Sequence, residues 1–203
     1  MADTTAELIE AGRALFRAKG FKATNVAKIA AKAGIAVGSF YKYFDSKEQL
    51  FVQVYVTENE ELKQRLFESV DFNDDPVTFA AKLVARNAVE MNANPILREW
   101  YNTKLMSKLE GHFQAQGFRS IHEMMQGGVT QLITQWKAEG RLRGDIDTGM
   151  IVALFKAIPY IDLHKSEIGP EYFPEILSYM TQFIMRGLTK PVHEPEDQQL
   201  YGI

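Results

Sequence analysis

The feature that most constrains the fold is a pair of short apolar segments, at residues 26–33 and 37–43, joined by a turn at Gly34. Helices of about two turns are not stable alone, so both segments have to pack on their neighbours. Gly20 ends an earlier helix with apolar residues at three- and four-residue spacing, and Ser46 can cap a longer helix that follows. We therefore expect three short helices at the start of the chain, packed against the beginning of a fourth.

Apolar spacing divides the side chains of this region into a buried set and an outward set. The expected buried set is Ile29, Ala30, Ala33, Phe40 and Phe44, with Phe16, Phe21 and Leu50 opposite them. The expected outward set on the third helix is Val37, Gly38, Ser39, Lys42 and Tyr43. The outward set is small at the helix N-terminus, as a helix needs if its first turn is to approach base edges in the major groove of DNA.

Two lysines stand at unusual positions, since Lys28 and Lys47 each fall in the first turn of an expected helix. A cation there opposes the helix dipole and costs about 0.3–1 kcal/mol in a free protein. Phosphate groups of a DNA backbone would reverse the sign of that effect, and the free N–H groups of the helix starts would add to the binding. The alternative is that both lysines are solvated and have no role.

Charge is distributed unevenly along the chain. Residues 1–50 carry a net charge of +3, whereas the whole chain carries −3. A basic head on an acidic remainder is typical of a module that binds a polyanion. The chain has no cysteine, which excludes disulfides and thiolate metal sites and suits a reducing, cytoplasmic location. No signal peptide is visible, and the most apolar run, residues 151–155, is too short to cross a bilayer.

The rest of the sequence predicts an all-α fold of about nine helices, with no segment typical of a strand. Asp75-Pro76 and Asn94-Pro95 each place a capping residue before a proline at a helix start. The later helices are expected at about residues 118–139, 148–165 with a kink at Pro159, and 174–188. The polar tail, residues 191–203, is expected to be disordered.

Four runs near the N-terminus resemble the DNA-binding domain of TetR-type regulators. They are Leu-Phe-Arg-Ala-Lys-Gly-Phe at 15–21, Ala-Thr-Asn-Val-Ala-Lys-Ile-Ala at 23–30, Ala-Gly-Ile-Ala-Val-Gly-Ser-Phe-Tyr-Lys-Tyr-Phe at 33–44 and Ser-Lys-Glu-Gln-Leu at 46–50. The resemblance covers about a quarter of the chain. It implies a helix-turn-helix DNA-binding domain at 1–51, with the motif itself at about 25–44, and a helical ligand-binding and dimerisation domain at 52–190.

The resemblance also implies a homodimer whose two heads occupy successive major grooves of a pseudo-palindromic operator. By position it implies phosphate contacts from Thr24, Tyr41 and Lys47, and groove contacts from Val37, Ser39, Lys42 and Tyr43. The chain departs from the family pattern at two positions. Ala36 stands where a capping Ser or Thr is common, and Lys28 where an acid often completes a capping box.

In such regulators the last two helices form the dimer interface. Two apolar stripes fit that role, one formed by Ile151, Leu154, Phe155 and Ile158 and the other by Leu177, Met180, Ile184 and Leu188. Two such helices from each subunit would form a symmetric four-helix interface. The alternative is that both stripes belong to the core of a single chain.

The middle helices of the family enclose a small-molecule pocket. Bulky, adaptable residues that suit an apolar ligand site are Trp100, Tyr101, Met106, Phe113, Phe118, Met124, Met125 and Trp136. Polar groups that could orient a ligand are Arg98, Asn102, His112, His122 and Gln126. Any one of these residues is more often plain core or surface. The spacing of the two histidines fits no helical metal pair, so no metal or other cofactor is expected.

The sequence therefore favours a DNA-binding transcriptional regulator, most simply a repressor released from its operator by a small apolar or amphipathic ligand. A ligand-independent activator, or a regulator controlled by a partner protein, fits the same residues almost as well. A helical enzyme is the remote alternative. Against it, the chain has no cysteine nucleophile, no metal-ligand cluster and no glycine-rich phosphate loop, so no catalytic residue is expected.

Overall fold

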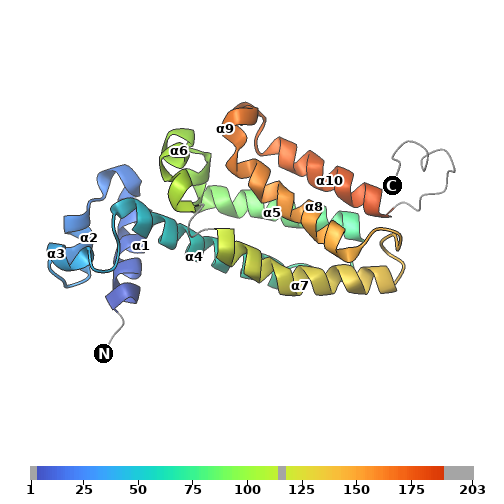
Figure 1. The fold of residues 1–203 in the computed structure, drawn as a ribbon, viewed down its shortest axis with the longest axis horizontal. Coiled ribbons are helices and arrows are strands. Elements are labelled where there is room, and N and C mark those ends of the chain that lie inside the picture. Colours follow the sequence, from blue (N-terminus) through green and yellow to red (C-terminus); the bar gives the residue numbers. More distant parts are fainter. Residues whose placement is uncertain (1–3, 114–117, 190–203) are drawn as a thin grey trace. The chain divides into compact units, whose positions relative to one another are not determined.

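The computed structural model describes residues 4–113 and 118–189, without the side chains of residues 118–127. Within these residues the fold is all-α, as expected, and has no strand (Figure 1). The α-helices are α1 (Thr4–Ala23), α2 (Val26–Lys32), α3 (Val37–Phe40), α4 (Lys47–Glu68), α5 (Pro76–Ala93), α6 (Thr103–His112), α7 (Phe118–Ala138), α8 (Thr148–Leu163), α9 (Lys165–Ile168) and α10 (Glu175–Thr189). Two short 3-10 helices, η1 (Leu97–Tyr101) and η3 (Pro170–Tyr172), also occur.

The chain divides into two compact units. Of the described residues, the first contains 4–69, 85–113 and 118–124, and the second contains 70–84 and 125–189. The domain boundary expected after residue 51 lies inside α4, which continues without interruption to Glu68. The division into a DNA-binding domain, a ligand-binding and dimerisation domain and a tail stays a prediction, and residues 191–203 lie outside the described part of the chain.

In the first unit, α1 packs on α2 and α4 and carries one side of an aromatic core. The helix breaks at Gly20, whose φ of 74° is a conformation that glycine adopts without strain. Phe16 of α1 lies edge to face with Phe51 of α4 at 5.0 Å between ring centroids, and Phe21 does the same at 5.1 Å. The expected burial of Phe16, Phe21 and Leu50 is confirmed.

Helices α2 and α3 are short and depend on this core. The Asn25 side chain caps α2 by accepting from the backbone N–H of Lys28 at 2.9 Å. Gly34 reverses the chain with a φ of 71°. Ile29, Ala30, Phe40 and Phe44 are buried as expected, whereas Ala33 is half-buried.

Helix α4 begins at the expected cap. The Ser46 hydroxyl accepts from the backbone N–H of Gln49 at 3.1 Å, and the Gln49 side chain accepts in turn from the backbone N–H of Asp45. The first bond caps the helix, and the second ties the Gln49 side chain to the residue before the cap, so the arrangement is a variant of the capping box. Further along the first unit, the Asn94 side-chain oxygen accepts from the backbone N–H groups of Ile96 and Leu97 at the entry to η1, and the Asn102 side-chain oxygen caps α6.

The core of the second unit surrounds Trp136 of α7, which lies edge to face with Phe79 of α5 at 5.1 Å between centroids. Asp147 caps α8 as expected, by accepting from the backbone N–H of Met150. The expected helix 148–165 divides at His164 into α8 and the short α9, so ten α-helices replace the expected nine in the described residues. Helices α8 and α10 pack side by side (Figure 1). None of the described helices is both long and apolar enough to span a membrane.

Candidate nucleic-acid interface

Helix α3 presents an exposed face of mixed chemistry. Val37 and Tyr43 are each 44% exposed although both are large and apolar, and Tyr41 is 55% exposed. Lys42 is also exposed, and Ser39 is half-buried. The side chains expected to point outward from this region are therefore accessible to a partner from solvent.

The buried side of the same helix holds this face in place. Phe40 is fully buried, and its ring contacts Tyr41 edge to face at 5.4 Å between centroids and Phe44 at 5.9 Å. The turn before α3 is fixed by the backbone N–H of Ile35, which donates to the carbonyl oxygen of Ala30 at 3.0 Å. A four-residue helix is thereby kept in one orientation by tertiary packing and not by its own stability.

The first turn of α3 is open. Its N-cap residue is Ala36, which provides no side-chain hydrogen bond to the helix start. A Cβ atom added at Gly38 would meet nothing within 4 Å, so space surrounds the backbone at this position. A small, uncapped helix start of this kind leaves N–H groups and backbone surface for a ligand to approach.

Thr24, expected at a DNA phosphate, is buried in the chain itself. It is 2% exposed, and its hydroxyl donates to the carbonyl oxygen of Gly20 at 2.9 Å. A hydroxyl has one proton and a phosphate oxygen is an acceptor. A phosphate contact from this hydroxyl therefore requires the Gly20 bond to be exchanged, and it stays a prediction.

Lys47 has a structural role that its sequence position did not reveal. Its ammonium donates to the carbonyl oxygens of Phe21 and Thr24, both at 2.9 Å, and lies 4.0 Å from the Phe21 ring centroid. A cation is favourable at these carbonyls because they close the C-terminal end of α1. Burial lowers the pKa of Lys47 below its ordinary value, although neighbouring Glu48 acts in the opposite direction. An ammonium has three N–H donors, so one remains for a phosphate.

Lys28 is the more accessible of the two cations. Its side chain is exposed and donates to the carbonyl oxygen of Ala23 at 3.2 Å. It lies in the first turn of α2, as expected, and its backbone N–H is the donor to the Asn25 cap. The first unit therefore brings two lysines to helix starts beside the α3 region, and a phosphate role for either one stays a prediction.

The residues expected to line a ligand pocket are distributed over both units. Trp100 and Phe113 lie together in the first unit, each in ring contact with Tyr55 of α4, which the sequence did not single out. Met106 is also buried there, Tyr101 and His112 are half-buried, and Arg98 and Asn102 are exposed. Trp136 belongs to the core of the second unit. The side chains of Phe118, His122, Met124, Met125 and Gln126 lie outside the described residues.

The residues expected at a dimer interface differ in how deeply they are buried. Ile151 and Leu188 are buried in the core of the second unit, and Phe155 and Ile184 pack against it. Leu154 is exposed, and the remaining three, Ile158, Leu177 and Met180, are half-buried. Two strongly exposed side chains on α10, Tyr179 and Phe183, were missed.

Sequence comparison connects this region and most of the chain to regulators. The family described as "Bacterial regulatory proteins, tetR family" matches residues 8–54, which contain the whole α2–α3 region. The transcriptional repressor KstR2 of Mycolicibacterium smegmatis is 24% identical over 187 residues, covering 87% of this chain and 90% of that protein.

Structural comparison shows the same fold. The structure of RolR in complex with resorcinol has a TM-score of 0.60 at 17% identity, and the match covers 97% of this chain and 92% of that one. The structure of Thermus thermophilus FadR, a TetR family repressor in complex with lauroyl-CoA, has a TM-score of 0.57 at 18% identity, with 94% and 98% covered. The all-helical architecture with an N-terminal helix-turn-helix is therefore that of TetR-like proteins.

Proposed function

We propose that this chain, a DNA-binding transcriptional regulator of the TetR type, is a repressor released from a pseudo-palindromic operator by a small apolar or amphipathic ligand. The observation that carries the DNA-binding part is the exposed face of α3, held outward by the buried Phe40. We also propose that the protein is cytoplasmic, because that is where it would meet operator DNA.

In this proposal α3 enters the major groove with its N-terminal turn, which has no side-chain cap, facing the bases. Val37, Gly38, Ser39, Lys42 and Tyr43 contact base edges, because these are the accessible groups of the helix and of the turn that follows it. Thr24, Lys28, Tyr41 and Lys47 contact phosphates on either side of the groove. Phosphate contacts fix the position of the head, and base contacts select the sequence.

The proposed ligand site includes the aromatic residues of the first unit. Tyr55, Trp100 and Phe113 form a contiguous cluster, with Tyr55 and Trp100 stacked at 5.6 Å between centroids. Such residues favour a planar or hydrocarbon ligand over a charged one. The ligands of the structural relatives, resorcinol and lauroyl-CoA, are aromatic and amphipathic respectively. Arg98, Asn102, Met106 and His112 remain candidates for this site, whereas Trp136 belongs to the core of the second unit.

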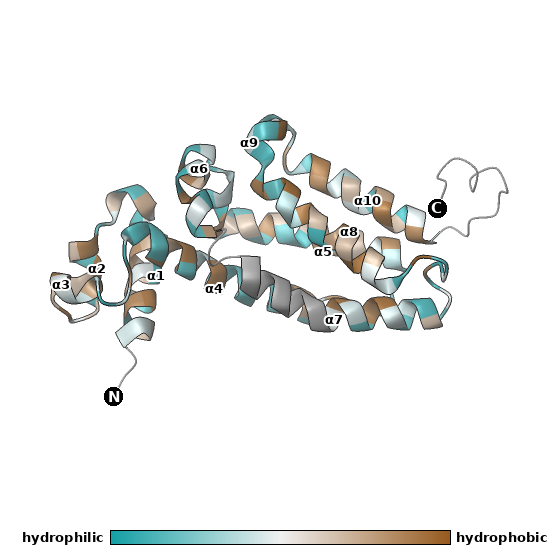
Figure 2. Cartoon of the chain, viewed as in Figure 1, coloured by the Kyte–Doolittle hydropathy of each residue, from teal (hydrophilic) through white to brown (hydrophobic). Residues whose placement is uncertain are grey.

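We also propose a homodimer formed through α8 and α10. Exposed Tyr179, Phe183 and Gly187 follow one another at four-residue spacing on α10, and no atom lies within 4 Å of a Cβ added at Gly187. On α8, exposed Met150 and Leu154 form a parallel stripe. Hydrophobic segments, brown in Figure 2, recur along both helices between more polar ones. A second copy of the chain would cover both stripes at once in a symmetric four-helix interface.

A ligand screen tests the release mechanism. Resorcinol, lauroyl-CoA and a library of apolar compounds are added while the melting temperature is recorded, and each compound that raises it is tested for its effect on operator affinity. Linkage requires that a releasing ligand weaken operator binding by the same factor as the operator weakens ligand binding. Compounds that raise the melting temperature and leave operator affinity unchanged would favour the ligand-independent alternative.

A further inference from the structure

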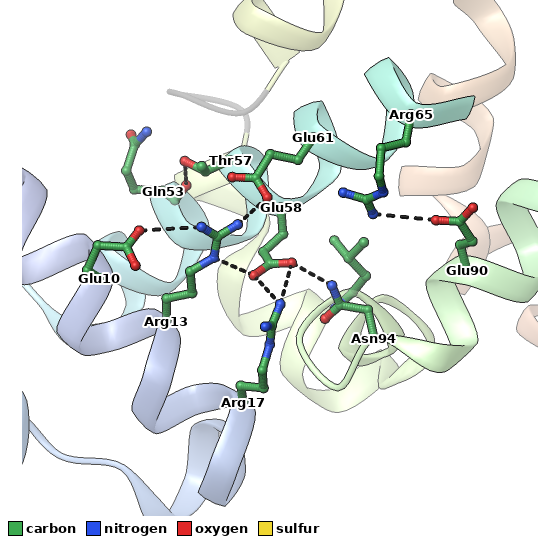
Figure 3. Close-up of polar contacts among 11 residues, drawn as sticks. Glu10, Arg13, Arg17, Gln53, Thr57, Glu58, Glu61, Arg65, Glu90 and Asn94 are labelled. Atoms are coloured by element: carbon green, nitrogen blue, oxygen red, sulfur yellow. Dashed lines mark hydrogen bonds and ion pairs between the residues drawn. The ribbon is translucent and has the colours of Figure 1, made fainter. Parts of the chain in front are cut away.

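A single buried carboxylate joins three segments of the first unit. Glu58 of α4 is 2% exposed, and its oxygens accept from the Arg13 Nε at 2.6 Å and from the Arg17 Nη2 at 2.9 and 3.1 Å, both on α1. They also accept from the Asn94 Nδ2 at 2.5 Å, where α5 passes into η1 (Figure 3).

The electrostatics of this cluster explain why the carboxylate remains charged. Burial raises the pKa of the Glu58 carboxyl, but hydrogen bonds from Arg13 and Asn94 and the charges of Arg13 and Arg17 outweigh that effect, so the pKa lies below its ordinary value. A buried carboxylate with all its partners in place gives little net stability but requires one particular geometry. The cluster therefore defines how its three segments meet.

Asn94 is held rigidly at its own position. Its side-chain oxygen accepts from the backbone N–H groups of Ile96 at 2.9 Å and Leu97 at 3.4 Å, and both of these residues are fully buried. Its backbone N–H donates to the carbonyl oxygen of Glu90 at the end of α5. The amide oxygen thus holds the backbone at the entry to η1 while the amide nitrogen donates to Glu58, so that a displacement of the α5–η1 corner moves a donor of the carboxylate.

At the α1 side of the cluster, Arg13 makes further ion pairs within α1 and with α4. Arg13 also pairs with Glu10 of α1 at 3.4 Å and with Glu61 of α4. Helix α1 carries Phe16 and packs directly on α2, to which α3 is joined. A change in the angle of α1 is therefore expected to change the orientation of α3, the helix proposed to enter the major groove.

Two other polar pairs join α4 and α5 and do not involve α1. Arg65 pairs with Glu90 at 3.4 Å, and Lys63 donates to Asn87 at 2.7 Å, and neither contact includes α1. These pairs provide matched controls, because they join the same two helices without the third segment.

Resting on the proposed DNA-binding function, we propose that Glu58 and Asn94 are positioning residues that couple the α5–η1 corner to α1 and thereby set the orientation of the DNA-binding head. Neither residue contacts DNA in this account. The signal from the corner reaches the head through α1 as well as along α4.

Two substitutions of Asn94 separate its backbone contacts at η1 from its contact with Glu58. Asn94→Ser and Asn94→Asp both keep a side-chain oxygen that can accept from the backbone N–H groups of Ile96 and Leu97. Serine is too short to donate to Glu58, and aspartate places a second carboxylate against it. Arg65→Ala is the control, since it removes an α4–α5 pair that stops short of α1.

The affinity of each variant is measured on a duplex that the wild-type protein has selected from random-sequence DNA. We expect about tenfold weaker binding for Asn94→Ser and a larger loss for Asn94→Asp, against less than about twofold for Arg65→Ala, since local couplings of this kind are typically 5- to 150-fold. Arg17→Ala combined with Asn94→Ser should weaken binding by less than the product of the two single effects, because both act through Glu58.

Hydrogen–deuterium exchange without DNA provides a second readout that does not depend on the operator. Exchange of α1 amides near Arg13 and Arg17 should rise in Asn94→Ser and remain unchanged in Arg65→Ala. If Asn94→Ser matches the control in both measurements, or if the single effects multiply in the double variant, the coupling is overturned while DNA binding stands. A wild-type protein that selects no duplex would overturn the DNA-binding function, and this inference with it.

Discussion

Large hydrophobic side chains are exposed both in the α3 region and on α8 and α10. The two regions differ in the residues that surround these side chains. On and after α3, exposed Val37 and Tyr43 are interspersed with Ser39 and Lys42. On α10, exposed Phe183 lies one turn from exposed Tyr179, and Met150 and Leu154 are exposed on α8. Exposed apolar area marks both as interaction faces.

The neighbouring groups indicate which partner each face fits. A hydroxyl and an ammonium beside small residues match base edges, phosphates and thymine methyl groups. Exposed aromatic residues and a glycine at four-residue spacing match another helix of the same kind. The comparison teaches that exposed hydrophobic residues identify an interface, whereas the polar residues between them identify the partner.

The largest expected effect comes from a charge on the α10 face. Phe183→Asp should convert the proposed dimer to monomer, because burying an unpaired carboxylate costs several kcal/mol, which is on the order of a hundredfold or more in affinity. Light scattering measures the mass, and circular dichroism should show unchanged helicity. Specific operator affinity should fall steeply, since a single head covers one half-site.

The neighbouring residue is the control for that substitution. Ile184 packs against the core of the second unit, so Ile184→Asp should lower the free energy of unfolding by about 3 kcal/mol or more and reduce helicity. If Phe183→Asp remains a dimer, or unfolds as Ile184→Asp does, the assignment of the α8–α10 face to a second copy is wrong.

A smaller effect is expected on the α3 face. Ser39→Ala should change the preferred base pair at one position of each half-site, since a base contact contributes about 1–3 kcal/mol of discrimination. The dependence of binding on salt should remain unchanged, because no charge is removed. Fluorescence anisotropy on singly substituted operators measures both quantities. Equal weakening at every base pair would place Ser39 outside the groove.

The two lysines at helix starts distinguish a phosphate role from a structural one. Lys28→Ala should reduce the slope of log affinity against log salt by about 1.8 for the dimer, at about 0.9 per phosphate, with the melting temperature unchanged. Lys47→Ala should also lower the free energy of unfolding, by roughly 1.5–3 kcal/mol, because two hydrogen bonds from a charged donor are lost at a half-buried site where water offsets part of the loss. An unchanged slope in both variants would mean that neither lysine contacts phosphate.

The sequence predicts the head well, because local signals there agree with tertiary packing. The burial of Ile29, Phe40 and Phe44 and the cap at Ser46 follow from spacing and from helix-start chemistry. Contacts between distant segments leave no such local signal. The Arg13–Glu58 pair joins residues 45 positions apart. Lys47 donates to the carbonyl oxygen of Phe21, at the end of α1 and 26 positions earlier in the chain.

The apolar stripes of the last helices show a second limit. Helix α8 has apolar residues on two adjacent faces, so that spacing alone does not decide which stripe is inward. The structure buries Ile151 and exposes Met150 and Leu154. On α10 it buries Leu188 and exposes Phe183 in the same way. Periodicity identifies an amphipathic helix, but the direction of its faces is set by the elements packed against it.

The central claim, that the exposed face of α3 reads DNA as one of two symmetric heads, is tested most directly by selecting binding sites from random-sequence duplexes. The account predicts an inverted repeat whose half-sites lie about 34–36 Å apart, one turn of DNA. The same selection with Ser39→Ala should return a repeat changed at matching positions of both half-sites. A pool without an enriched sequence, or an identical repeat for both proteins, would contradict the assignment of α3 as the helix that reads DNA.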